Sequence, residues 1–216
     1  MPFSTELTAA LSGATMGQLQ YWRSDRGDRG PVLVPEYRDG RTWLYSFRDV
    51  VALRTVVYLR EDKSLQKIRR ALETLDDVGE GAHLSEYVLV STDDGSIVWA
   101  DASSDSYVDL VNKPGQLREP VVMETVFGRF RDKDGGLVRP LCEPFPHIRI
   151  SPEVRGGYPV IKDTRVPYVN VATLVRDGVA PRAIRGIYPA VSAAAARDAA
   201  AFAAYVDERT QPRRAA

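Results

Sequence analysis

The chain has 216 residues, of which 44% are hydrophobic and 27% are charged, a composition typical of globular proteins and a length that suits two or three small domains. No apolar run approaches the ~20 residues of a membrane span, and the first residues lack the pattern of a signal peptide, so we expect neither. Cys142 has no second cysteine to pair with, which excludes an internal disulfide and favours a cytoplasmic protein.

Charge is distributed unevenly, although the formal net charge is +0. Residues 1–72 carry 12 basic and 8 acidic side chains, residues 73–147 carry 6 and 15, and residues 148–216 carry 11 and 6. The chain is therefore basic at both ends and acidic in the middle. This asymmetry bears on the choice of partners more than the total does.

The first predicted elements are two short helices joined by a tight turn. Apolar residues at helical spacing predict a first helix that Gly13 ends. Thr15 and Gln18 have the spacing of a capping box, so a second helix begins near Met16. Two helices in this arrangement, the second short and polar, are typical of a helix-turn-helix. The buried positions are Leu7, Ala10, Leu11 and Ala14 on the first helix and Met16, Leu19 and Trp22 on the second.

A β-hairpin and two further helices are predicted next. The extended runs Val32–Val34 and Trp43–Tyr45 lie on either side of Arg38–Arg41, a strong turn signal, and indicate a wing. Ser46 begins a helix that buries Val50, Leu53 and Val57, and Lys63–Ser64 begins another that stops near residues 76–79.

This order of elements resembles the MerR family of winged helix-turn-helix regulators. The resemblance covers about a third of the chain and implies that the helix from Met16 lies in the major groove of double-stranded DNA while the wing contacts the flanking backbone. The segments that carry it are Ser12–Thr15, Leu19–Trp22, Leu44–Val50 and Ser64–Ile68. The positions that match DNA contacts of the family are Gln18, Tyr21, Arg23, Arg41, Trp43 and Arg48.

Two departures from the family affect base recognition. Gly17 stands where many members have a long polar or basic side chain, and Trp43 stands near the position of a wing arginine. Base recognition is then either weaker or shifted to Gln18 and Gln20, because glutamine can bind adenine with two hydrogen bonds. The alternatives are that Trp22 and Tyr21 are core residues and that Arg48 is a solvated charge.

The family's long antiparallel dimerisation helix is not expected, since no heptads follow residues 76–79. This argues against a typical ligand-sensing activator. A homodimer is still expected, through another surface.

Residues 83–147 are predicted to form an acidic, β-rich region. Its acidic side chains are either a solvated surface or a surface complementary to a basic partner such as a nuclease. His83 and His147 are isolated from other metal-ligand types, so no metal site is expected. The predicted elements are a hairpin of residues 87–90 and 96–99 around the turn 93–95, a short helix at 107–111 and an extended run at 120–130.

The C-terminal region is predicted to contain two short extended pieces around Lys162–Thr164 and three helices. Gly178 ends the first helix, Pro181 and Pro189 bound the second, and Ser192 caps an alanine-rich third helix. The residues expected to face inward are Val171, Leu174 and Val175, then Ile184 and Ile187, then Phe202, Tyr205 and Val206.

From about Ile148 to Asp207, the chain resembles a small, uncharacterised tri-helical domain family common among bacterial antitoxins. Asp163 replaces the glycine usual before Thr164–Arg165. This pair is either a phosphate-binding element or, as we favour, a structural element in which Arg165 binds loop carbonyls. The segments that carry the resemblance are Gly157–Ile161, Thr164–Pro167, Asp177–Gly178 and Ile187–Pro189.

The predicted fold class is α+β, with domains at residues 1–82, 83–147 and 148–209 and a basic tail at 210–216. The combination of both resemblances is similar to VapB-like antitoxins that pair with PIN-domain ribonuclease toxins. It implies an autorepressor that binds its own promoter and neutralises a nuclease. The alternative is a stand-alone regulator whose middle region senses a small molecule. An enzyme and a cofactor are not expected, because the sequence has no glycine-rich phosphate loop, metal cluster or Cys–His pair.

Overall fold

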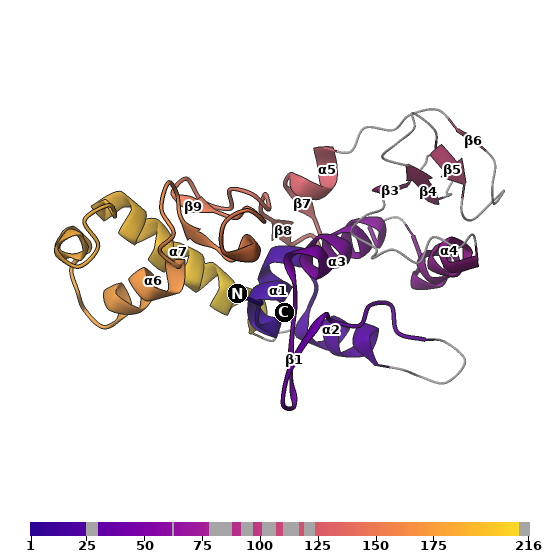
Figure 1. Ribbon diagram of the computed structural model, residues 1–216. Coiled ribbons are helices and arrows are strands. Elements are labelled where there is room, and N and C mark those ends of the chain that lie inside the picture. Colours follow the sequence, from indigo (N-terminus) through magenta and orange to yellow (C-terminus); the bar gives the residue numbers. More distant parts are fainter. Residues whose placement is uncertain are drawn as a thin grey trace.

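The computed structural model describes residues 1–24, 30–61, 63–77, 88–91, 97–100, 107–109, 117–118 and 124–211. Three regions follow one another along an elongated molecule (Figure 1): the C-terminal helices at one end, the N-terminal helices in the centre and a small sheet at the other end. In the described part of the chain, no helix is long and apolar enough to cross a membrane.

Helices α1 (Thr5–Ser12) and α2 (Met16–Arg23) form the predicted pair. Gly13 ends α1 in a left-handed conformation (φ 85°), and a Cβ there would lie 2.5 Å from Val138 Cγ2, so the position favours glycine twice over. Thr15 and Gln18 form the predicted capping box. Leu19 and Trp22 are buried, which confirms the predicted inner side of α2 and the reading of Trp22 as a core residue.

The wing is a hairpin of β1 (Tyr37–Asp39) and β2 (Thr42–Leu44). The prediction of Val32–Val34 as its first strand was wrong. Val32 and Leu33 are buried, and their amides donate to the Trp22 carbonyl, so this apolar run closes the end of α2. The true strand is exposed along its whole length and has no apolar alternation to indicate it.

Helix α3 (Phe47–Leu59) begins at the predicted Ser46, which forms a second capping box with Asp49. Val50, Leu53 and Val57 are buried as predicted. Helix α4 (Leu65–Asp77) follows Ser64, whose hydroxyl oxygen accepts from the Lys67 amide. The predicted end of this helix, near residues 76–79, lies partly outside the described residues, since residues 78–87 are not among them.

The middle of the chain contains a four-stranded antiparallel sheet in the order β3-β4-β5-β6, which lies against α3 and α4. Its strands are β3 (Val88–Ser91), β4 (Ile97–Ala100), β5 (Tyr107–Asp109) and β6 (Leu117–Arg118). The pairing of β3 with β4 confirms the predicted hairpin.

Two predictions for the middle region were wrong. The expected helix near Tyr107 contains β5, since Val108 pairs with Trp99 of β4 and the chain there extends the hairpin. The expected extended run includes the helical turn α5 (Glu124–Phe127). The pairing of β5 with β4 and the packing of α5 onto α3 depend on residues far away in the sequence, so local patterns do not indicate them. A second hairpin follows, made of β7 (Phe130–Arg131) and β8 (Leu137–Val138).

The C-terminal region is built on the pair β9 (Ile148–Arg149) and β10 (Val160–Ile161), with the 3₁₀ turn η2 (Arg155–Gly157) between them. Helix α6 (Tyr168–Arg176), the 3₁₀ helix η3 (Pro181–Gly186) and helix α7 (Ala193–Thr210) follow. The predicted second helix is thus a 3₁₀ helix, and Ile187 is 52% exposed and not inward-facing. Proline and glycine so close together leave room only for the tighter, shorter helix.

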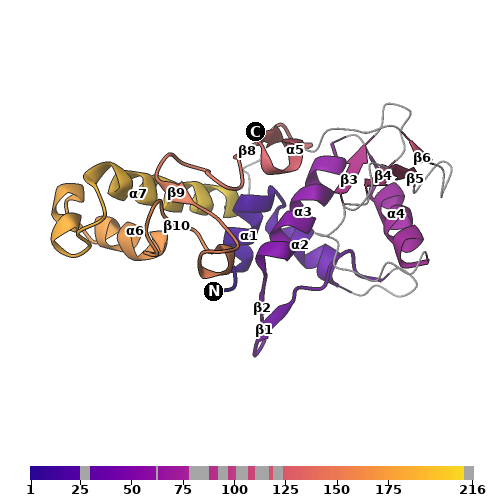
Figure 2. The ribbon, with the colours of Figure 1, turned by 45° about the horizontal axis from the view of Figure 1, so that its top comes forward.

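Helix α7 joins the C-terminal region to the N-terminal helices. Figures 1 and 2 show it as a long rod whose far end reaches α1. The Tyr205 hydroxyl donates to the Ala10 carbonyl at 3.1 Å. Phe202, Ala199 and Ala196 are fully buried, so the alanine-rich helix is packed as predicted, and one continuous apolar core runs through both regions.

Stability at alkaline pH should depend on Tyr168 of α6. Burial raises the pKa of its hydroxyl well above the ordinary 10.0. Its contribution to folding is therefore fully present below pH ~10 and is lost as the pH rises toward the raised pKa, since only the unfolded chain ionises there. We expect the free energy of unfolding, from urea titrations, to fall above pH ~10 and to fall less in Tyr168→Phe.

The ring of Phe would keep the contact of Tyr168 with Phe202, whose ring centre lies 4.6 Å away. Tyr37→Phe is the control, because Tyr37 is 50% exposed on the wing. The free energy of unfolding of this variant should fall with pH as that of the wild type does. An identical alkaline decline in Tyr168→Phe and the wild type would contradict this prediction.

Candidate nucleic-acid interface

The outer face of α2 presents the residues expected to recognise bases. Gln20 is exposed, and Tyr21 is 40% exposed, so the reading of Tyr21 as a core residue was wrong. Gly17 meets nothing within 4 Å of where its Cβ would be. The first turn of this face is therefore open, and the polar surface of α2 begins at Gln18 and Gln20.

Gln18 has a second role that limits its part in base recognition. Its side-chain Oε1 accepts from the Thr15 backbone amide at 2.8 Å, and its backbone amide donates to Thr15 Oγ1 at 3.1 Å. A glutamine that binds adenine with two hydrogen bonds needs both its carbonyl oxygen and its amide nitrogen. Because the capping box already occupies the oxygen, Gln20 is the better placed of the two for this contact.

Arginines lie on the first strand of the wing and at its turn. Arg41 is exposed at the hairpin turn. Arg38 lies opposite Trp43, with its guanidinium 4.8 Å from the centre of the Trp43 ring and its Nε donating to the Gly40 carbonyl at 2.9 Å. Trp43 is therefore partly covered by a cation.

Sequence reasoning missed Arg38 as a candidate contact. Its place opposite Trp43 follows from the strand register, which the wrong first strand concealed. A guanidinium held by stacking and one backbone bond is ordered before it meets a phosphate, which reduces the entropy lost on binding.

Arg23 connects α2 to the base of the wing. Its terminal nitrogen donates to the Tyr45 hydroxyl at 3.2 Å. Burial raises the pKa of Tyr45, and Arg23 opposes this by stabilising the phenolate. Arg48, three residues after Tyr45, is exposed in the first turn of α3. The structure thus places Gln20, Tyr21, Arg41 and Arg48 on the surface, and it places Gln18, Arg23 and Trp43 partly inside.

The acidic middle region and the histidines make no site of their own in the described residues. His147 Nδ1 lies 2.6 Å from Asp198 Oδ2, which also accepts from the His147 amide, so this pair fastens β9 to α7. His83 lies outside the described residues. Among those described, no group of three or more potential ligands could hold a metal ion.

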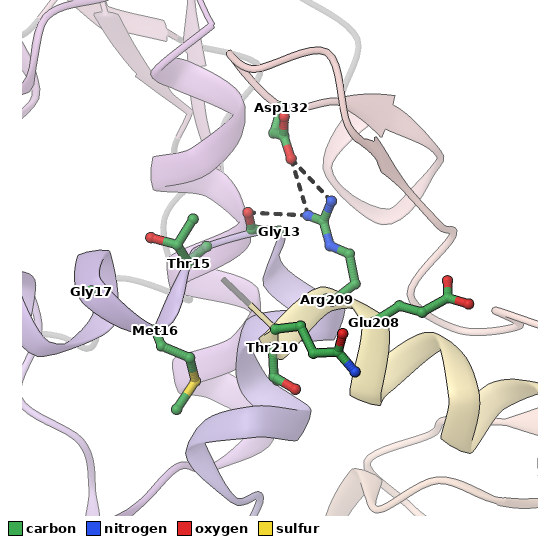
Figure 3. A pocket seen from close by; sticks show the side chains of 10 residues that line it. Gly13, Thr15, Met16, Gly17, Asp132, Glu208, Arg209 and Thr210 are labelled. Atoms are coloured by element: carbon green, nitrogen blue, oxygen red, sulfur yellow. Dashed lines mark hydrogen bonds and ion pairs between the residues drawn. The ribbon is translucent and has the colours of Figure 1, made fainter. Parts of the chain in front are cut away.

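A pocket of about 410 Å³ lies where the turn before α2 meets the end of α7 (Figure 3). Gly13–Gly17 and Glu208–Gln211 line it together with Asp132. Two nitrogens of Arg209 donate to Asp132 Oδ2, each at 3.1 Å, and one also donates to the Gly13 carbonyl at 3.2 Å. One guanidinium therefore joins the helix-turn-helix, the β7–β8 turn and α7.

Comparison with known families gives two matches in separate parts of the chain. Residues 3–75 match the family described as MerR HTH family regulatory protein, and residues 148–203 match the family described as Protein of unknown function (DUF433). No curated protein and no solved structure matches the chain. The first match spans α1, α2, the wing, α3 and most of α4, which includes every predicted DNA contact. The chain therefore has a MerR-family helix-turn-helix domain at its N-terminal end, which indicates a DNA-binding transcription regulator, and a DUF433 domain at its C-terminal end.

Proposed function

We propose that this protein is the antitoxin of a type II toxin–antitoxin system, which represses its own promoter through the helix-turn-helix and neutralises a PIN-type ribonuclease toxin. The observation that carries the DNA-binding half is the outer face of α2 beside an arginine-bearing wing. Gln20 and Tyr21 are exposed on that helix, and Arg38 and Arg41 are exposed on the wing. This is the arrangement in which a helix reads the major groove while the wing binds backbone phosphates.

Two features support the antitoxin half. The C-terminal domain resembles a domain common among bacterial antitoxins, and residues 73–147 carry 15 acidic and 6 basic side chains. An acidic segment is complementary to the cationic groove with which a ribonuclease binds RNA. Since α7 packs on α1, the DNA-binding face and the C-terminal domain belong to one folded body.

DNA binding should depend on Arg41 and Gln20 in different ways. Arg41→Ala should weaken binding several-fold on any duplex and make the slope of log K against log salt shallower by about 0.9, the value for one lost phosphate contact. Gln20→Ala should weaken binding to the promoter and leave non-specific binding unchanged, because base contacts carry the specificity. Fluorescence anisotropy with promoter and scrambled duplexes at several salt concentrations measures both.

Arg185→Ala is the matched control, since Arg185 is an exposed arginine on η3, away from α2 and the wing. The assigned DNA face is wrong if Arg41→Ala and Gln20→Ala both bind promoter DNA as Arg185→Ala does.

The toxin half is tested by co-expression of the full chain with the product of the adjacent gene. We expect a complex of defined mass and loss of ribonuclease activity in it. Arg41→Ala should inhibit the ribonuclease as well as the wild type while binding promoter DNA less tightly, which separates the two functions. Absence of both a complex and inhibition would leave only the DNA-binding half.

A second candidate is a regulator that senses a small molecule, which the pocket beside the turn before α2 favours. Its walls come from the MerR-matched domain, from Asp132 and from the end of α7 beyond the DUF433 match, so a ligand there would contact the DNA-binding domain directly. The middle region, which the sequence suggested for this role, lies mostly outside the residues whose side chains are described. Ligand-dependent promoter binding in the absence of any toxin gene nearby would favour this candidate.

A further inference from the structure

The η2 loop of the C-terminal domain lies on the DNA-binding domain at the start of α3. Gly157 packs against the ring of Phe47, so closely that a Cβ at Gly157 would lie 2.6 Å from Phe47 Cδ2. The Met1 nitrogen donates to the Arg155 carbonyl at 2.8 Å. The residue after Phe47 is Arg48, a predicted phosphate contact, so the loop is beside one edge of the candidate interface.

The same loop is adjacent to the base of the wing. Tyr158 lies with its ring centre 6.1 Å from that of Phe3. Phe3 exchanges two backbone hydrogen bonds with Tyr45, the residue that follows β2, at 2.7 and 2.9 Å. Figure 2 shows the wing and the N-terminus projecting on the same side of the molecule. The η2 loop therefore packs against the base of the wing through the buried Phe3.

Two exposed arginines lie in this part of the C-terminal domain, Arg155 in the η2 loop and Arg165 between β10 and α6. Arg155 Nε donates to the Arg165 carbonyl at 2.7 Å, and a terminal nitrogen of Arg155 lies 3.5 Å from Met1 Sδ. The Arg155 side chain is thus ordered, and within the described part of the chain no carboxylate pairs with either guanidinium. The sequence favoured an Arg165 side chain that binds loop carbonyls. The side-chain bonds of this turn are instead made by Thr164, whose hydroxyl donates to the Ile161 carbonyl and accepts from the Val166 amide.

The backbone that presents Arg155 is strained. Arg155 has φ 53°, and Gly156 and Gly157 follow at 64° and 86°. A residue with a Cβ adopts a left-handed conformation only at a cost in free energy, and such strain persists where the surroundings enforce it. Here the contact of Gly157 with Phe47 and the bond to Met1 hold the loop that carries Arg155 against the start of α3.

We propose that Arg155 and Arg165 bind phosphates of the DNA backbone beyond the wing, so that the DNA-binding surface extends onto the C-terminal domain. This inference rests on the proposed DNA binding by the helix-turn-helix. Arginine suits the role because its planar guanidinium matches a phosphate with two parallel hydrogen bonds.

Position carries the proposal more than the amount of charge. Residues 153–165 contain three basic and two acidic side chains, and Lys162 is paired with Glu143 at 3.2 Å. The two arginines that remain are Arg155, in the loop that contacts the start of α3, and Arg165, whose carbonyl accepts from Arg155 Nε. We therefore expect two local phosphate contacts and no general affinity of this domain for nucleic acid.

The experiment measures binding of the full chain to two promoter duplexes, one long and one trimmed on the side where the wing binds. Arg155→Ala and Arg165→Ala should each weaken binding to the long duplex several-fold and make the salt slope shallower by about 0.9. Trimming the duplex should weaken binding of the wild type but not of the double variant that combines Arg155→Ala and Arg165→Ala, since the lost phosphates are those that the arginines contact. Arg185→Ala, in the same domain, should behave as the wild type on both duplexes.

The proposal is overturned if the double variant binds the long duplex as Arg185→Ala does, or if trimming affects it as much as the wild type. It is likewise overturned if the double variant loses only a protein partner and keeps its DNA affinity. If the wild type binds neither duplex, the proposed function of the helix-turn-helix has failed, which is a different result. Thermal unfolding of each variant checks that the fold is retained.

Discussion

Arg54→Met is expected to lower the free energy of unfolding by about 3–5 kcal/mol, because it leaves several buried carbonyls without donors. Arg54 lies in the middle of α3 and is fully buried. Its guanidinium donates to the carbonyls of Leu11, Val126, Gly128 and Arg139. It also lies over the ring of Phe130, 4.9 Å from the ring centre. These partners come from α1 and from the segment that precedes the DUF433 domain, so one side chain fastens three parts of the fold.

The pKa of Arg54 is lowered to about 10 by burial, which means that the folded protein meets a real cost in keeping this charge away from water. The carbonyl oxygens offset the cost by supplying negative dipoles around the guanidinium. Methionine would remove the charge and keep much of the volume, so the expected loss measures the unsatisfied carbonyls and not a cavity.

Urea unfolding of the full chain measures this effect, and two variants serve as controls. Arg54→Lys should also be strongly destabilised, because one ammonium cannot reach four carbonyls in the geometry of a planar fork. Arg60→Met should cost no more than about 1 kcal/mol, since the buried Nε of Arg60 has no hydrogen-bond partner to lose. A loss below about 1 kcal/mol in Arg54→Met would show that the carbonyls find other donors.

The elements that could be predicted from the sequence are those with strong local signals. The Thr15–Gln18 capping box and the N-cap at Ser46 were predicted at the right residues, because a cap depends on residues only three apart. The two family matches show a MerR-family helix-turn-helix domain at the N-terminal end and a DUF433 domain at the C-terminal end, while the bounds of the three predicted domains stay predictions.

The elements that failed depend on distant partners. Val32–Val34 looks like a strand, but the amides of Val32 and Leu33 donate to the Trp22 carbonyl at the end of α2. Tyr107–Asp109 is a strand because β4 lies beside it. Arg54 gave no signal at all, since the carbonyls that bind it in α5 and beyond are more than seventy residues away. A buried arginine is rare enough that sequence patterns place such a residue on the surface.

The candidate site shows a subtler limit. The sequence predicted Gln18 both as a cap and as a base contact, and each prediction is reasonable alone. The structure shows that both need the same Oε1 atom. Only geometry shows that competition, and it moves the expected adenine contact to Gln20.

Arg209→Met should also have a large effect, a loss of about 3–5 kcal/mol in the free energy of unfolding. The side chains of Arg209 and Asp132 are only 14% and 7% exposed. Removing the cation takes the Arg209 guanidinium away from the nearly buried Asp132 carboxylate, whose other oxygen still accepts from the Asp134 and Gly136 amides. The long methylene stem of Arg209 is replaced by methionine of similar length, so packing beside Gly13 is kept.

A double-mutant cycle separates the ion pair from everything else that each residue does. Asp132→Asn removes the charge and retains a carbonyl oxygen for the turn, and the double variant should recover about 1–3 kcal/mol relative to the sum of the two single losses. Lys133→Met is the matched control, because the Lys133–Asp134 pair has a similar 2.7 Å separation but side chains that are 40% and 43% exposed, and breaking it should cost less than about 1 kcal/mol. Additive losses in the cycle would mean that Arg209 stabilises the junction only through the Gly13 carbonyl. A coupled result would mean that the Arg209–Asp132 ion pair itself holds the β7–β8 turn against the end of α7.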